Sequence, residues 1–142
     1  MHDQVVFFGA NDSCLEGAKG GQHVSVKRFM ENIVKIITHP SLKYHHPRIL
    51  LLTPPPIDEY GCEDNDRSKG YDEPRRQAEH TKLYADAVRR IAEAHDVALV
   101  DVWALLMEES GYTLGKEALP GSKALPPNPQ LRLYLHDGKS TL

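Results

Sequence analysis

Three short apolar runs divide the chain, and two longer amphipathic segments lie between them. The runs are Val5–Phe8, about Ile49–Thr53, and the VALVD segment at 97–101. A strand with one face in water would alternate apolar and polar residues, so the continuous run predicts a strand covered on both faces in a parallel sheet. The alternation of strands and helices predicts an α/β fold with right-handed crossovers and about three strands.

The segment between the first two strands carries a single apolar stripe. Its apolar residues recur at helical spacing: Val26, Phe29, Met30, Ile33 and Ile37. Ser25 is a suitable N-cap, and the residue before Pro40 is disfavoured in a helix. The spacing therefore predicts a helix that starts after Ser25 and stops before Pro40.

The region after the second strand is strongly polar. Residues 54–71 begin with three prolines and then carry several acidic side chains, at a spacing that does not match a calcium-binding loop. We expect a solvated loop here. Asp72 is then predicted to cap a second long helix, whose buried face contains Tyr84, Ala87, Val88 and Ile91.

The last third of the chain contains a third strand and a short helix. Asp101 ends the VALVD strand and can cap a helix that buries Trp103, Leu106 and Met107. The proline-rich segment 119–129 predicts irregular structure. We expect residues 1–142 to form a single domain.

Composition excludes several classes of protein. With 142 residues, 40% of them hydrophobic and 26% charged, the chain can bury a sizeable core. A net charge of -3 and scattered basic residues argue against a nucleic-acid partner. No apolar run approaches the ~20 residues of a membrane span, and the N-terminus does not resemble a signal peptide. Cys14 and Cys62 are expected to be free thiols in a reducing, cytoplasmic setting.

The candidate site lies where the first strand ends. In open α/β sheets, ligands bind beyond the carboxyl ends of the strands, and Gly9–Asp12 falls there. Gly9 allows a backbone conformation that a side chain would forbid, and Asn11 offers two N–H donors that suit a developing oxyanion. The alternative is that Asn11 and Asp12 only form a turn and cap a helix.

Five segments occur in an order typical of one enzyme family. They are FFGANDS, QHVSVKRFMENI, ILLLTPPP, VDVWALL and YLHDG. Together they resemble the SGNH/GDSL hydrolases, most closely the isoamyl acetate-hydrolysing esterase branch. The resemblance implies a flavodoxin-like α/β/α sandwich that hydrolyses small carboxylic esters without a cofactor. It also implies that Asn11 is an oxyanion-hole donor and that Asp137 is the aspartate that orients the catalytic histidine.

Two parts of the family pattern are missing from the printed sequence. There is no Gly-Asp-Ser block for the nucleophile, and Ser140 stands where the histidine is expected. Ser13 and Cys14 lack the surroundings of a nucleophile, and His136 is wrongly placed to act as the base. The remaining histidines, His23, His45 and His46, lack the spacing of a metal site, so no metal is expected.

We therefore expect a partial esterase domain, truncated at both ends, that is inactive as printed. A non-catalytic α/β fragment or partner-binding module is the alternative. In either case the Val5–Phe8 strand would lie at the edge of the sheet and allow self-association, because a family strand that pairs with it is absent.

Overall fold

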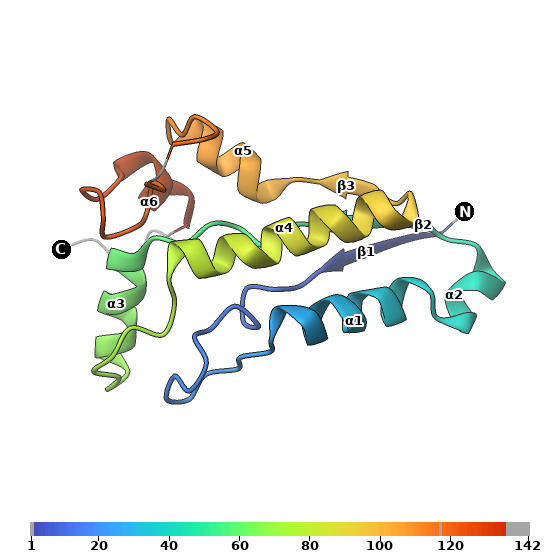
Figure 1. Ribbon diagram of the computed structural model, residues 1–142, viewed down its shortest axis with the longest axis horizontal. Coiled ribbons are helices and arrows are strands. Elements are labelled where there is room, and N and C mark those ends of the chain that lie inside the picture. Colours follow the sequence, from blue (N-terminus) through green and yellow to red (C-terminus); the bar gives the residue numbers. More distant parts are fainter. Residues whose placement is uncertain (1, 117, 136–142) are drawn as a thin grey trace.

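The computed structural model describes residues 2–116 and 118–135 and contains a three-stranded parallel sheet (Figure 1). The strands are β1 (Asp3–Phe7), β2 (Arg48–Leu52) and β3 (Ala98–Val100), in the spatial order β1-β2-β3. The predicted α/β class, the parallel sheet and all three strands are confirmed. β1 starts earlier than predicted, and Phe8 lies outside it.

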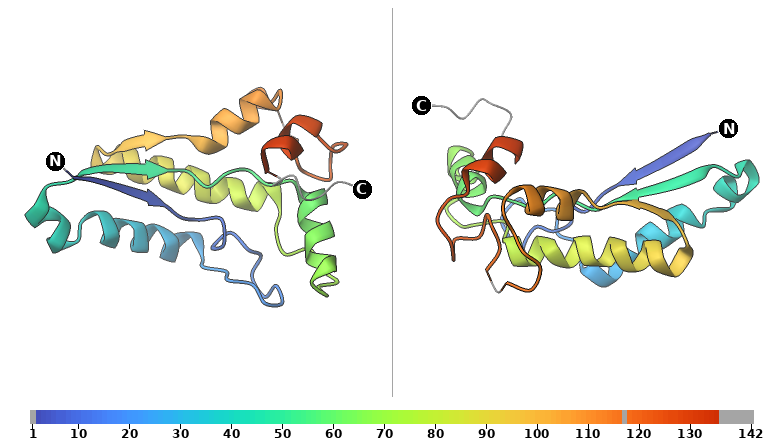
Figure 2. Two further views of the ribbon diagram at one scale, coloured as in Figure 1. Left: turned by 180° about the vertical axis from the view of Figure 1, so that it is seen from behind. Right: turned by 90° about the horizontal axis from the view of Figure 1, so that it is seen from above.

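Two helices cover one face of this sheet. α1 (Val26–Ile37) and α4 (Ala78–His95) lie side by side under the strands, as the view from above shows (Figure 2). Both predicted apolar stripes are confirmed, except that Met30 and Val26 are only half-buried. The core contains Val6, Phe29, Ile33, Ile37, Leu51, Tyr84, Ala87, Val88, Ile91 and Ala92.

The opposite face of the sheet is not covered by any described segment. The register aligns two rows of side chains across it, and these are Val5, Leu50 and Ala98, then Phe7, Leu52 and Val100. Val5 and Phe7 are 53% and 50% exposed. The prediction that the first strand is covered on both faces is therefore wrong for the described residues. Each strand lies on the same side of the strand before it, in the order β1-β2-β3. Right-handed crossovers therefore place both long helices on the same face of the sheet.

A short helix that the sequence did not predict follows α1. α1 ends at Ile37 as expected, but α2 (Pro40–His45) begins at the proline itself. Proline has no N–H to leave unpaired at the first helical position, so it can start a helix as readily as it ends one. The His39 side chain caps α2 by accepting from Ser41 N.

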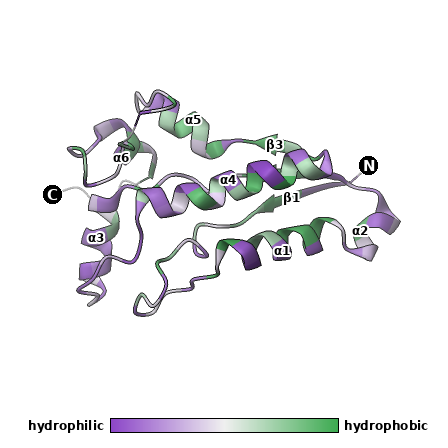
Figure 3. Ribbon diagram, in the orientation of Figure 1, coloured by the Kyte–Doolittle hydropathy of each residue, from purple (hydrophilic) through white to green (hydrophobic). Residues whose placement is uncertain are grey.

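The predicted loop at 54–71 is wrong in its middle, which forms α3 (Glu59–Ser68). Asp58 caps α3 by accepting a hydrogen bond from Gly61 N at 3.1 Å, and Glu63 pairs with Arg67 one turn later. Figure 3 shows that α3 is almost entirely hydrophilic. It therefore lacks the apolar stripe from which a helix is predicted.

The start of α4 also differs from the prediction. α4 begins at Ala78 rather than after Asp72, and Gln77 makes no side-chain capping bond. The carboxylate of Glu59 accepts from Ala78 N at 2.7 Å. A side chain from α3 thus performs the role that was assigned to Asp72.

The predicted short helix is α5 (Val102–Glu109), and Asp101 caps it by accepting from Ala104 N at 3.0 Å. Trp103 and Met107 are buried as expected, whereas Leu106 is half-buried. A second core cluster joins α5 to the start of α4, and it consists of Ala78, Ala85, Trp103, Met107 and Leu119. The segment before α6 (Pro129–Leu135) is irregular, as predicted.

Candidate functional site

The turn after β1 requires the glycine that begins it. Gly9 has a φ of +114°, which side chains strongly disfavour. A Cβ at this position would lie 3.1 Å from Pro54 Cγ and 3.3 Å from Phe29 Cζ. The chain from β1 therefore passes close to the prolines that follow β2, in a backbone conformation that a side chain at position 9 would strain.

The turn is held by its backbone and by Ser13, not by the side chain of Asn11. Ser13 N donates to Gly9 O at 3.0 Å, Cys14 N donates to Asn11 O at 3.1 Å, and Ser13 Oγ donates to Ala10 O at 3.1 Å. Asn11 itself is exposed. Its carboxamide is therefore free of the turn, as a donor to an external oxyanion must be.

Arg76 is the side chain that contacts this carboxamide. Its Nη2 donates to Asn11 Oδ1 at 3.3 Å, and its Nε donates to Ala10 O at 3.4 Å. Sequence reasoning missed Arg76, because it lies 65 residues from Asn11 and belongs to no motif. Only the folded chain brings the two together.

Asp101, at the carboxyl end of β3, has a structural role. Its carboxylate accepts from Arg89 Nε at 2.7 Å and from Thr53 Oγ1 at 3.1 Å, in addition to its capping bond. Burial raises the pKa of Asp101, but these hydrogen bonds and the Arg89 charge outweigh it, so the pKa lies below its usual value. The ionised carboxylate joins Thr53, directly after β2, to α4 and α5.

The described residues offer no activated nucleophile near Asn11. Ser13 and Cys14 are fully buried, and Ser13 Oγ donates a hydrogen bond to Ala10 O and accepts one from Thr81 Oγ1. Burial raises the pKa of Cys62 to about 11, so its thiol stays protonated at neutral pH. Both cysteines are free, as expected.

A cavity of about 750 Å³ lies between α4 and α5, and Arg89, Trp103 and Met107 are among its lining residues. None of its lining residues comes from the turn after β1. Residues 2–116 and 118–135 also contain no group of three or more His, Cys, Asp or Glu side chains that could hold a metal ion.

The second predicted catalytic residue cannot be placed. Asp137, like His136 and Ser140, lies outside the described residues. The structure thus brings Gly9 and Asn11 together at the end of β1, and it does not test the role of Asp137.

Comparisons with known proteins show which class of proteins this chain is similar to. No family model matches the chain. A GDSL esterase/lipase of Arabidopsis thaliana is 38% identical over 115 residues, which cover 76% of this chain and 47% of that protein. A lipase/acylhydrolase from Enterococcus faecalis has a similar fold, with a TM-score of 0.53 and 24% identity over 73% of this chain and 43% of that one. The chain is thus related to the GDSL esterases and lipases.

The particular branch predicted from the sequence is also among the relatives. The isoamyl acetate-hydrolysing esterase 1 homologue of Mus musculus is 30% identical over 107 residues, which cover 75% of this chain and 43% of that protein. The chain spans less than half the length of the relatives it matches. No helix among residues 2–116 and 118–135 is long and apolar enough to cross a membrane.

Proposed function

We propose that this chain supplies the oxyanion donor, Asn11, of a carboxylic ester hydrolase that acts on small-molecule esters. The observation that carries the proposal is the exposed Asn11 carboxamide at the carboxyl end of β1, which the turn does not use. In such a reaction a serine attacks the ester carbonyl, a histidine takes the serine proton, and the negative charge develops on the carbonyl oxygen. An N–H donor that already faces this oxygen stabilises the transition state.

The topology indicates where a serine nucleophile would have to enter. Among the described residues β1 pairs only with β2, so its other edge is free, and its carboxyl end leads directly to Asn11. A parallel strand that paired with this edge would end at the same edge of the sheet as β1, where ligands bind in open α/β sheets. A serine at the carboxyl end of the added strand would therefore lie beside Asn11.

As printed, the chain contains no Gly-Asp-Ser block. We infer that it does not hydrolyse esters by itself. The test is incubation of the purified chain with a fluorophosphonate probe and with short-chain p-nitrophenyl esters, with no labelling and no turnover above background expected. Stoichiometric labelling of Ser13 or of any other serine would contradict this inference.

The role of Asn11 is tested in a full-length relative that carries the same Gly-x-Asn-Asp block. Changing that asparagine to alanine should lower kcat by ~10² to 10³, the usual loss for one oxyanion donor. A loss of less than about threefold would favour the alternative in which Asn11 only forms a turn.

A non-catalytic binding module remains the second proposal, and the bare sheet face favours it. Val5, Phe7 and Val100 expose apolar surface next to the free edge of β1. A strand edge with unpaired N–H and C=O groups pairs readily with another strand. We propose that two copies of the chain associate through this edge.

We also propose a cytoplasmic location, which the two free cysteines support because disulfides are rare in reducing compartments.

A further inference from the structure

Arg76 connects two distant parts of the chain at the candidate site. It lies in the segment before α4, and its guanidinium reaches the turn after β1, where it donates to Asn11 Oδ1 at 3.3 Å and to Ala10 O at 3.4 Å. The two bonds use different nitrogens of one planar group. The side chain of Asn11 and the backbone of the turn are thus tied to the same rigid donor.

The chemistry of this contact fixes which end of the carboxamide is held. A guanidinium has five N–H donors and no acceptor, so it can bind only the oxygen of a carboxamide. In the described residues, Asn11 Nδ2 donates to no acceptor. Both of its N–H groups are therefore free for a ligand. The opposite orientation would present Oδ1 to the developing oxyanion and repel it.

Arg76 also forms no ion pair with a described residue. Within residues 2–116 and 118–135, no carboxylate lies within ion-pair distance of Arg76. Its neighbour differs: Arg75 is paired with Asp66 at 3.4 Å and donates to Gly20 O at 2.9 Å. Arg75 thus anchors the loop before α4, whereas Arg76 adds an unneutralised positive charge beside Asn11.

From these contacts we propose that Arg76 is the positioning residue that holds the Asn11 carboxamide by its oxygen and aims its N–H groups at the oxyanion. This inference rests on the function proposed for Asn11. Arg76 acts through Asn11 and needs no contact with the substrate.

The test is side-chain amide relaxation in the ¹⁵N-labelled chain. In the unaltered protein the Asn11 NH₂ group should be ordered, with an order parameter near the ~0.85 of a rigid group. Arg76→Met keeps the aliphatic stem and removes every donor, so the value should fall below about 0.6. Arg76→Lys keeps the charge and loses the planar fork, and it should give an intermediate value.

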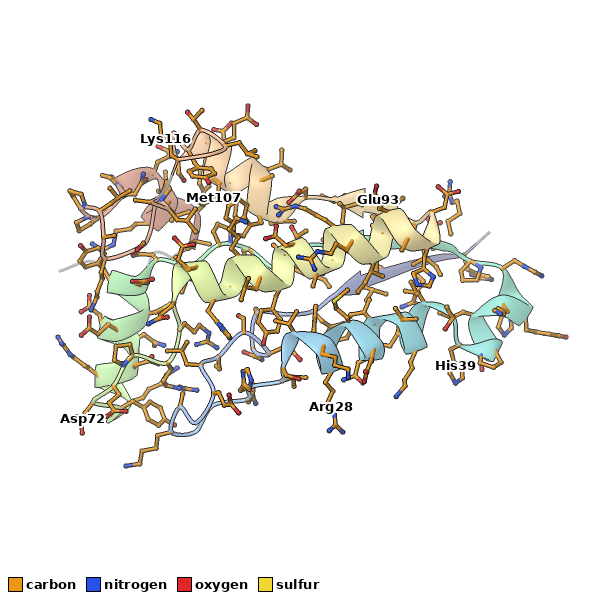
Figure 4. The ribbon with its side chains drawn as sticks, viewed as in Figure 1. Arg28, His39, Asp72, Glu93, Met107 and Lys116 are labelled. Atoms are coloured by element: carbon orange, nitrogen blue, oxygen red, sulfur yellow. The ribbon has the colours of Figure 1, made fainter. Side chains whose placement is uncertain are left out.

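Arg28→Met is the matched control, because Arg28 points away from the sheet on the outer side of α1 (Figure 4). It should leave Asn11 unchanged. Asn32, exposed on α1, is the internal reference for a mobile carboxamide. Arg76→Lys keeps the test valid if Arg76→Met does not fold. An Asn11 amide as mobile as Asn32 in the unaltered chain, or unaffected by both Arg76 variants, would overturn the proposal.

This readout needs no ester hydrolysis. An ordered, Arg76-dependent Asn11 together with a fully active asparagine-to-alanine relative would refute the proposed function and leave the positioning contact standing. A mobile Asn11 together with a strongly impaired relative would refute the positioning role alone.

Discussion

The Glu59 carboxylate and the backbone N–H of Ala78 are joined by a 2.7 Å hydrogen bond, so a residue in the first turn of α3 caps the start of α4. The second oxygen of Glu59 accepts from Lys123 N at 2.9 Å. Negative charge at a helix N-terminus is favourable, because the first N–H groups of the helix have no internal partner. One side chain thus connects α3, α4 and the irregular segment before α6.

Glu59→Ala should destabilise the chain by about 2 kcal/mol, because it removes a helix cap and leaves a second N–H without its acceptor. A domain of this size should lose roughly 6 °C in Tm, measured by circular dichroism. Glu31→Ala, an exposed change on α1, is the control and should shift Tm much less. Equal shifts in the two variants would show that the Glu59 bonds contribute nothing specific.

Gly9→Ala should cost about 2–4 kcal/mol, since it adds a strained positive φ and close contacts with Pro54 and Phe29. Gly70→Ala is the matched control. Gly70 also has a positive φ, +82°, but a Cβ there would meet nothing within 4 Å. Urea unfolding measures both, and a Gly9 variant as stable as the Gly70 variant would contradict the close packing of the turn.

His80 should make the stability depend on pH. Its ring packs against Tyr84 and His23, with centroids 5.5 Å and 5.8 Å away, and its buried Nε2 has no hydrogen-bond partner among the described residues. Burial, and then the His23 charge, lower the pKa of His80 in the folded chain. The unfolded chain therefore binds more protons, so stability is lost as the pH falls below the unfolded pKa of about 6.5.

Thermal melts at pH 7.5 and 5.5 measure this effect. His80→Phe keeps a ring and removes the titration, so the difference in Tm between the two pH values should shrink. His45→Gln, an exposed change on α2, should leave that difference as it is. An unchanged difference in His80→Phe would show that other groups dominate the acid response.

Phe7→Lys should weaken the proposed association of two copies. Phe7 is 50% exposed on the bare face of β1, and a lysine there would place charge in the apolar contact. Sedimentation velocity over a concentration series should show association of the unaltered chain and a monomeric variant. Leu83→Lys, on α4, is the control with comparable exposure, 47%. A monomeric unaltered chain at all concentrations would exclude the association.

The repeating apolar patterns made most of the fold predictable from the sequence. Phe29 and Ile33 mark α1 through their spacing, and Asp101 marks the start of α5 because it directly follows a strand. These signals are local: each depends on residues within a few turns of one another. The predicted strand, helix and strand order therefore agrees with the structure.

The features that the sequence did not predict depend on contacts between residues far apart in the chain. α3 is stabilised by the Asp58 cap and by the ion pair from Arg132 to Asp58 at 2.9 Å, and neither produces an apolar stripe. The cap from Glu59 and the contact of Arg76 with Asn11 likewise join separate segments. The continuous apolar run of β1 indicates burial on both faces, whereas the described residues cover only one of them.

The spatial order β1-β2-β3 is the order in which the strands are synthesised. Each new strand pairs with the one made just before it, so no strand has to enter between two that are already joined. At ~5–20 residues per second, β3 leaves the ribosome roughly 5–20 s after β1. β2 emerges about midway through that interval, so β1 and β2 can pair before β3 is made.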